Sequence, residues 1–285
     1  MHLAFAILLN FLSDRVRPYN FFERGDMMLL AIDMGNTNIT FGAYLEDELL
    51  FVSRLATDRA RTKDQYAVEL LNILMLNNIS SKEFSGAIIS SVVPELTAAI
   101  SSAVEKIVSL KPMLLGPGLK TGMNILTDNP AQVGADLIAG SVAAAMHYRL
   151  PCLVVDVGTA TKISVVDENG SFCGCTITAG VAISLNALAH NTSQLPNISL
   201  TAPPHVIGKN TIDSMQSGTV FGTAAMIDGL CERIEDELGV KARAIVATGG
   251  LAADIVCSCK RKVIYNGELI LEGLKIIYHK NVKAK

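Results

Sequence analysis

The chain has 285 residues, which is enough for two domains of ordinary size, and 50% of them are hydrophobic, so a large core is expected. The net charge is −3, Trp is absent, and Lys and Arg do not gather in clusters. This composition argues against nucleic acid as a partner, because such partners need a basic surface and benefit from aromatic stacking.

Residues 1–27 differ from the rest of the chain. Their apolar run over residues 2–12 is too short to span a bilayer, and it lacks the basic start and the cleavage site of a signal peptide. We therefore predict that folding begins near Met28 and that residues 1–27 form an extension outside the fold. Since no other segment is a membrane candidate, we expect a cytoplasmic protein with no membrane partner.

The folded part opens with an apolar run that ends at Asp33, a turn of small residues, and a returning strand over residues 39–45. The turn is neither a Walker loop nor a dinucleotide fingerprint. It still contains the parts of a phosphate site. Gly35 lets backbone amides approach an anion, Asn36 and Thr37 add donors, and Asp33 can hold a cation. Alone, the motif fits an ordinary hairpin with an Asx turn equally well.

The same pattern returns in residues 152–166. An apolar strand ends at Asp156, Gly158 and Thr159 form the turn, and a β-branched strand returns. An acidic turn follows both copies. Asp33 and Asp156 therefore mark two halves of an internal repeat, and two such hairpins facing each other would hold a polyphosphate from both sides.

The remaining elements alternate between helix and strand. We expect strands over residues 86–93, 113–115, 171–178, 243–248 and 262–265, and helices over residues 65–78, 95–110, 130–148, 180–190, 211–238 and from 268 onward, with a short helix after 250. This predicts two α/β domains, residues 28–149 and 150–285, with mixed sheets and a cleft between them. Ligands of such sheets gather at the carboxyl ends of strands, where Asp33 and Asp156 fall.

The six cysteines include two C-x-C pairs, whose spacing is not typical of zinc sites. We expect reduced thiols, as in other cytosolic proteins.

Five motifs occur in an order that resembles the type III pantothenate kinase family, within the superfamily of actin, hexokinase and acetate kinase. They are Asp33-Met-Gly-Asn-Thr-Asn38, Asn129-Pro-Ala-Gln-Val-Gly-Ala-Asp136, Asp156-Val-Gly-Thr-Ala-Thr161, Thr192-Ser-Gln-Leu-Pro196 and Thr248-Gly-Gly250. The resemblance runs from about residue 28 to near the C-terminus. It implies two duplicated RNase H-like or actin-like domains with an ATP cleft between them, and a homodimer.

The resemblance also implies an activity, namely ATP-dependent phosphorylation of pantothenate to 4'-phosphopantothenate, the entry step to coenzyme A, with Mg²⁺ accompanying ATP. Asp136 corresponds to the general base, and Asp156 to the site of a monovalent cation, K⁺ or NH₄⁺. The implied ATP contacts are Asp33, Met34, Gly35, Asn36, Thr37, Asn38, Ile39, Thr40 and Thr159. The implied substrate contacts are Gly134, Ala135, Asp136, Leu137 and Thr192. Without the resemblance, Asp136 would be read as a first-turn carboxylate that the helix dipole favours.

The chain departs from the family pattern mainly on the substrate side. Leu137 replaces an Arg that offers fixed donors to carboxylates and phosphates. Thr127 replaces a substrate-binding Tyr, and residues 174–180 vary a glycine-rich segment. Lys162 replaces a Thr, where it could reach phosphate or occupy the space of the cation. The alternatives are a kinase with a shifted substrate and a nucleotide-binding accessory or regulatory homologue without catalysis.

Overall fold

The structure is a computed structural model that describes residues 28–192 and 195–282. The predicted extension, residues 1–27, lies outside this part of the chain. Within the described ranges, none of the helices combines the length and the apolar character that crossing a lipid bilayer requires.

The first half forms a mixed five-stranded sheet in the order β3-β2-β1-β4-β5. The strands are β1 (Met28–Met34), β2 (Asn38–Leu45), β3 (Glu48–Ala56), β4 (Phe84–Ser91) and β5 (Met113–Leu114). Strands β1 to β3 form an antiparallel meander, whereas β4 lies parallel to β1 and β5 parallel to β4. Because both faces of β1 are covered, its residues are almost all apolar.

The second half repeats this topology, since its order read from the other edge is β8-β7-β6-β9-β10. The strands are β6 (Cys152–Val157), β7 (Ala160–Val166), β8 (Phe172–Ala179), β9 (Ala244–Thr248) and β10 (Ile264–Tyr265). Again three strands form an antiparallel meander and two follow in parallel. The expected duplication of an α/β unit with a mixed sheet is confirmed.

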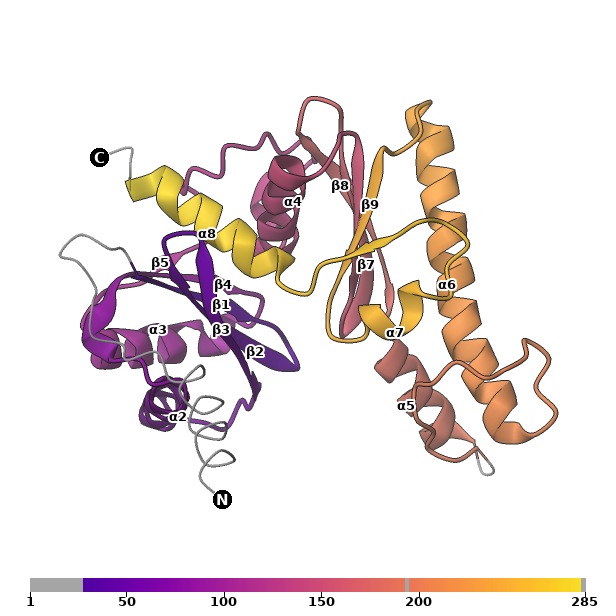
Figure 1. Ribbon diagram of the computed structural model, residues 1–285, viewed down its shortest axis with the longest axis horizontal. Helices are drawn as coiled ribbons and strands as arrows, with labels where there is room; N and C mark the ends of the chain where they lie inside the picture. Colours follow the sequence, from indigo (N-terminus) through magenta and orange to yellow (C-terminus); the bar gives the residue numbers. More distant parts are fainter. Residues whose placement is uncertain (1–27, 193–194, 283–285) are drawn as a thin grey trace, which may run out of the picture.

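Helices cover the outer face of each sheet. The first sheet packs against α2 (Lys63–Leu76) and α3 (Pro94–Val108), which form one core with β1, β2 and β4. The second sheet packs against α5 (Val181–Asn191), α6 (Thr211–Leu238) and α7 (Ala252–Val256). Figure 1 shows α6 along the edge of the molecule opposite the first sheet.

Two further helices lie between the sheets (Figure 1). They are α4 (Ala135–His147) and α8 (Leu269–Val282), and they pack along each other. Helix α4 contacts β4 of the first sheet and β6 and β7 of the second. Helix α8 follows the second sheet but packs on β1 and β4 of the first. The division into residues 28–149 and 150–285 stays a prediction, and these contacts make α4 and α8 a layer shared by both halves.

Two local expectations differ from the structure. The expected helix over residues 130–148 is broken, because Val133 and Gly134 are extended and only a short 3₁₀ turn, Pro130–Gln132, precedes them. Helix α4 therefore starts at Ala135, which places Asp136 in its first turn. No strand was expected between residues 46 and 64, yet Glu48–Ala56 form β3, because their backbone pairs with β2.

The shared layer depends on a close approach at Gly273 of α8, where a Cβ atom would collide with the carbonyl oxygen of Ala139 in α4. Gly273→Ala should lower the free energy of unfolding by about 2 kcal/mol, the usual cost of overpacking a tight contact. Gly218→Ala is the matched control, because Gly218 of α6 has open space around it. Alanine there should stabilise the helix by about 0.5–1 kcal/mol. Urea unfolding of both variants measures the difference, and equal stability would contradict the packing described.

Candidate active site

The two hairpins meet at their tips. The hydroxyl oxygens of Thr37 and Thr159 lie 2.7 Å apart, although the residues are separated by 122 positions in sequence. The turns close in the same manner, since Gly35 N–H donates to the carbonyl of Asn38 at 2.9 Å and Gly158 N–H to that of Ala160 at 3.1 Å. The expectation that the two hairpins face each other is confirmed.

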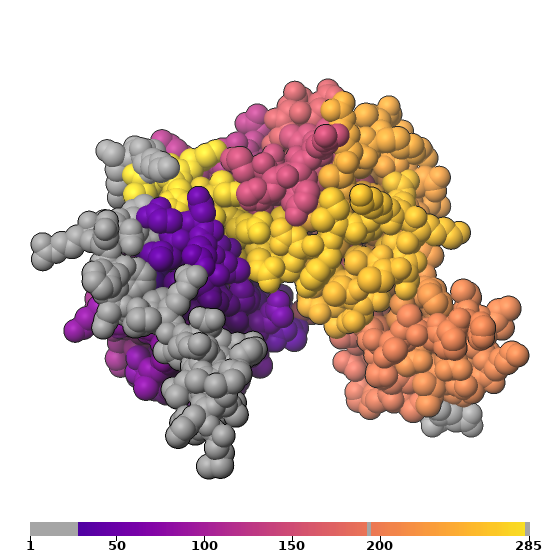
Figure 2. All heavy atoms as spheres, viewed as in Figure 1, coloured from indigo at the N-terminus to yellow at the C-terminus, as the bar shows by residue number. Residues whose placement is uncertain are grey.

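A cavity of about 1080 Å³ opens between the two halves. Figure 2 shows the surface hollowed between the indigo first half and the orange segment of the second. Both repeats contribute to its wall, together with the start of α4 and the Thr-Gly-Gly turn after β9. The charged side chains of the lining are Asp33, Arg54, Asp128, Asp136, Asp156 and Lys162.

Two of these carboxylates come from different elements and lie on either side of one ammonium group. Lys162 Nζ lies 2.6 Å from Asp136 Oδ2 and 2.7 Å from Asp156 Oδ2. The side chains of Lys162, Asp136 and Asp156 are only 16%, 12% and 14% exposed, respectively. Burial alone would lower the pKa of the Lys162 ammonium, but Asp156 and Asp136 outweigh it and raise this pKa. The ammonium therefore stays charged.

Asp33 has a different environment. Its Oδ1 atom is buried and has no hydrogen-bond partner. Burial, and then the negative charge of Asp136, raise the pKa of Asp33 to about 7. A desolvated carboxylate oxygen without a partner is costly, so this atom is suited to a cation that arrives with a ligand.

The Thr-Gly-Gly turn packs tightly against the second hairpin. Gly249 has φ of 99°, and a Cβ atom there would lie 2.6 Å from the Val157 carbonyl oxygen and 2.7 Å from Asp156 Oδ1. Only glycine fits this combination of backbone conformation and close approach. The turn thus forms part of the cavity wall beside Asp156.

Most of the predicted site residues lie together, and a few do not. The cavity is lined by Asp33, Gly35, Asn36, Thr37, Asn38, Thr40, Gly134, Asp136, Leu137, Asp156 and Thr159. The side chains of Met34 and Ile39 belong to the buried core instead. Ala135 is not part of the lining. Thr192 lies at the end of α5, where its hydroxyl donates to the carbonyl of Leu188 at 2.8 Å, and the fold does not bring it to the cavity.

Sequence reasoning missed two residues beside the first hairpin. Thr57 clamps the turn, since its hydroxyl donates to Gly35 O at 2.7 Å and its backbone N–H to Thr37 O at 2.8 Å. Arg54 pairs in register with Thr40, which in turn pairs with Asp33. Recognising β3 as a strand would have placed Arg54 in this row, whereas nothing in the sequence marks Thr57.

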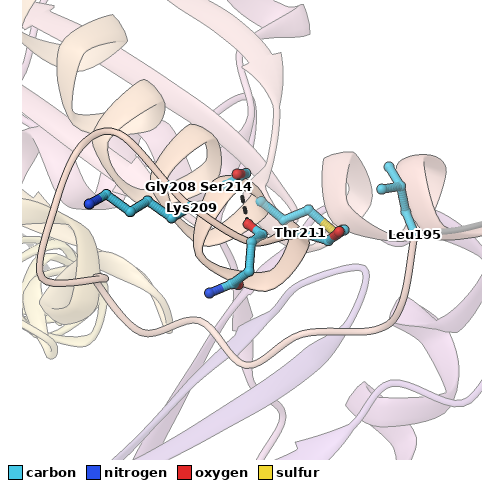
Figure 3. Close-up of a pocket in the computed structure, with 7 residues that line it drawn as sticks. Leu195, Gly208, Lys209, Thr211 and Ser214 are labelled. Carbon is cyan, nitrogen blue, oxygen red and sulfur yellow. Dashed lines mark hydrogen bonds between the residues drawn. The ribbon is translucent and has the colours of Figure 1, made fainter.

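A second hollow of about 520 Å³ lies at the start of α6, far from the carboxylates. It is lined by Leu195, Gly208, Lys209, Asn210, Thr211, Ser214 and Met215. Figure 3 shows Lys209 extending away from Leu195 and Thr211, while the Ser214 hydroxyl donates to the Asn210 carbonyl at 2.8 Å. Lys209 is the charged residue of this lining, whereas the charged groups described above converge in the cavity between the two halves.

Comparison with known proteins agrees with this geometry. The profile of type III pantothenate kinases matches residues 29–233. A type III pantothenate kinase of Myxococcus xanthus (strain DK1622) is 42% identical over 254 residues, covering 89% of this chain and 99% of the relative. One from Halalkalibacterium halodurans is 40% identical over 255 residues, covering 90% and 100%. The chain belongs to the type III pantothenate kinase family.

Solved structures support the fold of the family. Component A of (R)-2-hydroxyglutaryl-CoA dehydratase from Acidaminococcus fermentans superposes with a TM-score of 0.57 at 15% identity, covering 91% of this chain and all, 100%, of that one. A Campylobacter jejuni protein described as of the Baf family superposes with a TM-score of 0.56 at 23% identity, covering 89% and 99%. At these identities the likeness concerns the fold alone.

The family implies ATP with a divalent cation, and the residues fit that requirement. Mg²⁺ is commonly held by one or two carboxylates together with substrate phosphates. The unpartnered Asp33 Oδ1 beside the first hairpin is suited to such a role. Within residues 28–192 and 195–282 no group of three or more His, Cys, Asp or Glu side chains forms a metal cage, and this mode of binding requires none.

A monovalent cation at Asp156 does not fit in the same way. The Asp156 Oδ2 atom that would ligate it is already 2.7 Å from the Lys162 ammonium. A second cation at these oxygens would lie beside a fixed positive charge.

The raised pKa of Asp33 predicts a pH-dependent instability of the protein without nucleotide or metal. As pH rises from about 4 toward 7, the unfolded chain releases this proton while the folded state retains it, so stability falls as pH rises. Asp33→Asn should remove the loss and increase the free energy of unfolding at about pH 8 by at least about 1.4 kcal/mol more than near pH 5. Denaturant unfolding in EDTA measures this difference. Glu237→Gln, an exposed change on α6, is the control, and an equal pH response of both variants would contradict the assignment.

Proposed function

We propose that this protein transfers the γ-phosphoryl group of ATP to the primary hydroxyl of pantothenate, forming 4'-phosphopantothenate in the first step of coenzyme A synthesis. The observation that carries the proposal is the position of Asp136. It lies in the first turn of α4 and faces the cavity that the two hairpins close.

The two hairpins are the proposed ATP site. Gly35 closes the turn and leaves room for the phosphates, while Asn36, Thr37, Asn38 and Thr40 of the first repeat and Thr159 of the second are the proposed donors. Asp33 would hold Mg²⁺, which neutralises the charge of the phosphates when it is bound. Arg54 adds positive charge in line with Asp33 and Thr40. Met34 and Ile39 contribute by fixing the strands from the core.

Asp136 is the proposed general base. Its Oδ1 accepts from the Leu137 N–H at 2.8 Å and its Oδ2 from Lys162 Nζ at 2.6 Å, so both carboxylate oxygens are held in place. Asp136 takes the hydroxyl proton as the substrate oxygen bonds to the γ-phosphorus and the bond to ADP breaks. Such a transfer requires hydrogen-bond reach, and the position of Asp136 at the cavity wall supports this role.

The proposed substrate side of the cavity is the part around the start of α4. Gly134 and Leu137 line it, and Leu137 offers no donor for the carboxylate of pantothenate. Thr127 Oγ1 is buried there without a hydrogen-bond partner, so it is available to a polar group of the substrate. Because Leu137 stands where the family has Arg, an accessory protein that binds nucleotide without catalysis is the second candidate function.

The roles of Ala135 and Thr192, the homodimer and the cytoplasmic location stay predictions from the family resemblance. Light scattering during size-exclusion chromatography measures the oligomeric state directly.

The reaction itself is tested by ADP release from purified protein with ATP and Mg²⁺ in potassium buffer, with and without pantothenate. We expect release that depends on pantothenate. A rise in melting temperature with ATP, but no release with pantothenate, would instead support the accessory protein, because a ligand that binds only the folded state stabilises it.

Removal of the base should separate catalysis from binding. Asp136→Asn keeps an acceptor for Lys162 and should lower kcat by about 100-fold or more, on the scale of general-base removal. The KM for ATP should change little, since the hairpins are intact. Asp64→Asn, which breaks an exposed ion pair with Lys106 on the surface, is the control and should leave kcat unchanged. Unchanged turnover of Asp136→Asn would show that another group takes the proton.

A further inference from the structure

The side chain of Lys162 ends between two carboxylates of the cavity, 2.6 Å from Asp136 Oδ2 and 2.7 Å from Asp156 Oδ2. We infer that this ammonium is a cation built into the chain, which replaces a diffusible monovalent cation at Asp156 and holds Asp136 in position. The catalytic part of the inference rests on the proposed function. Lys162 is a positioning residue, because it acts on the substrate through Asp136.

Strand pairing fixes this placement. Lys162 of β7 is the direct cross-strand partner of Asp156 of β6 in the antiparallel pair. Partners of this kind have Cβ atoms about 5 Å apart on the same face of the sheet. The Lys162 side chain therefore starts beside Asp156 and needs only its own length to reach Asp136 at the start of α4. The contact follows from the backbone register, so it does not depend on a chance rotamer of an exposed lysine.

The internal repeat provides a comparison within the same molecule. In the first hairpin the partner of Asp33 on the returning strand is Thr40, and Asp33 Oδ1 has no hydrogen-bond partner. In the second hairpin the corresponding partner of Asp156 is Lys162, and Asp156 is ion-paired. One aspartate is thus open to an ion that enters with the ligand, whereas the other already has its cation.

The ammonium has the properties that a monovalent cation would supply at this place. It carries one charge, binds oxygen atoms at the distances given above, and is 16% exposed, so water screens it little. Two of its three donors are taken by Asp136 and Asp156, and one remains. It lowers the repulsion between two neighbouring carboxylates and the phosphates that bind beside them.

The first experiment uses the wild-type protein and measures pantothenate-dependent ADP release in chloride salts of potassium, sodium, ammonium and choline. At equal ionic strength we expect rates within about twofold of each other, since only general screening remains. A rate that is many-fold higher in potassium or ammonium than in choline would overturn the inference. If no salt supports turnover, the proposed function fails, and the binding experiment described next still tests Lys162.

The second experiment removes the ammonium with Lys162→Thr, which leaves both carboxylates in place. In choline chloride kcat should fall, and potassium or ammonium should restore it by about tenfold or more, the usual size of coupling between two sites. Lys106→Thr, which removes an exposed ion pair on α3, is the control and should show no cation response. A purely structural role of Lys162 would give a loss that no cation restores, and this result would overturn the inference.

A readout without catalysis completes the test. The melting temperature of the ligand-free protein is measured while potassium replaces choline at constant ionic strength. Lys162→Thr should show a saturable increase, because a cation that binds only the folded state stabilises it. The wild type should show none. A saturable increase in the wild type would show that Asp156 still binds a diffusible cation, and it would overturn the inference whether or not the protein is a kinase.

Discussion

Negative charge gathered in a partly buried cavity is the constraint on which this structure depends. Asp33, Asp136 and Asp156 converge from β1, α4 and β6, and the polyphosphate proposed to bind among them is itself an anion. Burial without compensation would protonate these groups or drive the two halves apart. The ammonium of Lys162 neutralises part of this charge by pairing with Asp136 and Asp156. Asp33 has no such partner, and we propose that a cation bound together with the ligand neutralises it.

The shared helical layer brings these groups together. Helix α4 begins only after the extended Val133 and Gly134, so Asp136 lies at the edge of the layer and faces the cavity. Helix α8, packed along α4, returns from the second half to the first sheet and ties the two repeats to each other. Close packing at Gly273 leaves α4 little freedom to shift, which keeps its first turn at a constant distance from both hairpins.

The two repeats share one topology and serve different purposes. In the first hairpin Asp33 Oδ1 has no hydrogen-bond partner, and the Thr57 hydroxyl holds the turn by donating to Gly35 O. Both features suit the proposed site for phosphates and a metal ion. The second hairpin uses its carboxylate to hold Lys162, and through Lys162 the proposed base. None of the departures noted in the sequence falls on the first hairpin, the proposed ATP side. They lie at Leu137 and Thr127, on the proposed substrate side, and at Lys162, which we infer takes the place of an ion.

The sequence by itself determined the internal repeat, the mixed character of the sheets, and Asp33 and Asp156 as two of the cavity carboxylates. Strand periodicity, the Asp-x-Gly turns and their order along the chain are local patterns, so the sequence contains them. It left two roles open for Lys162 and gave no sign of Thr57. It also placed Thr192 among the substrate contacts, a role that stays a prediction, and in the structure Thr192 is not one of the residues that line the cavity. Only the tertiary structure shows where these side chains lie. Strand register puts Lys162 opposite Asp156, and the packing of α4 brings Asp136 to the same ammonium, from a position 26 residues earlier in the chain. Such distances depend on how whole elements pack, and no local pattern of residue types contains them.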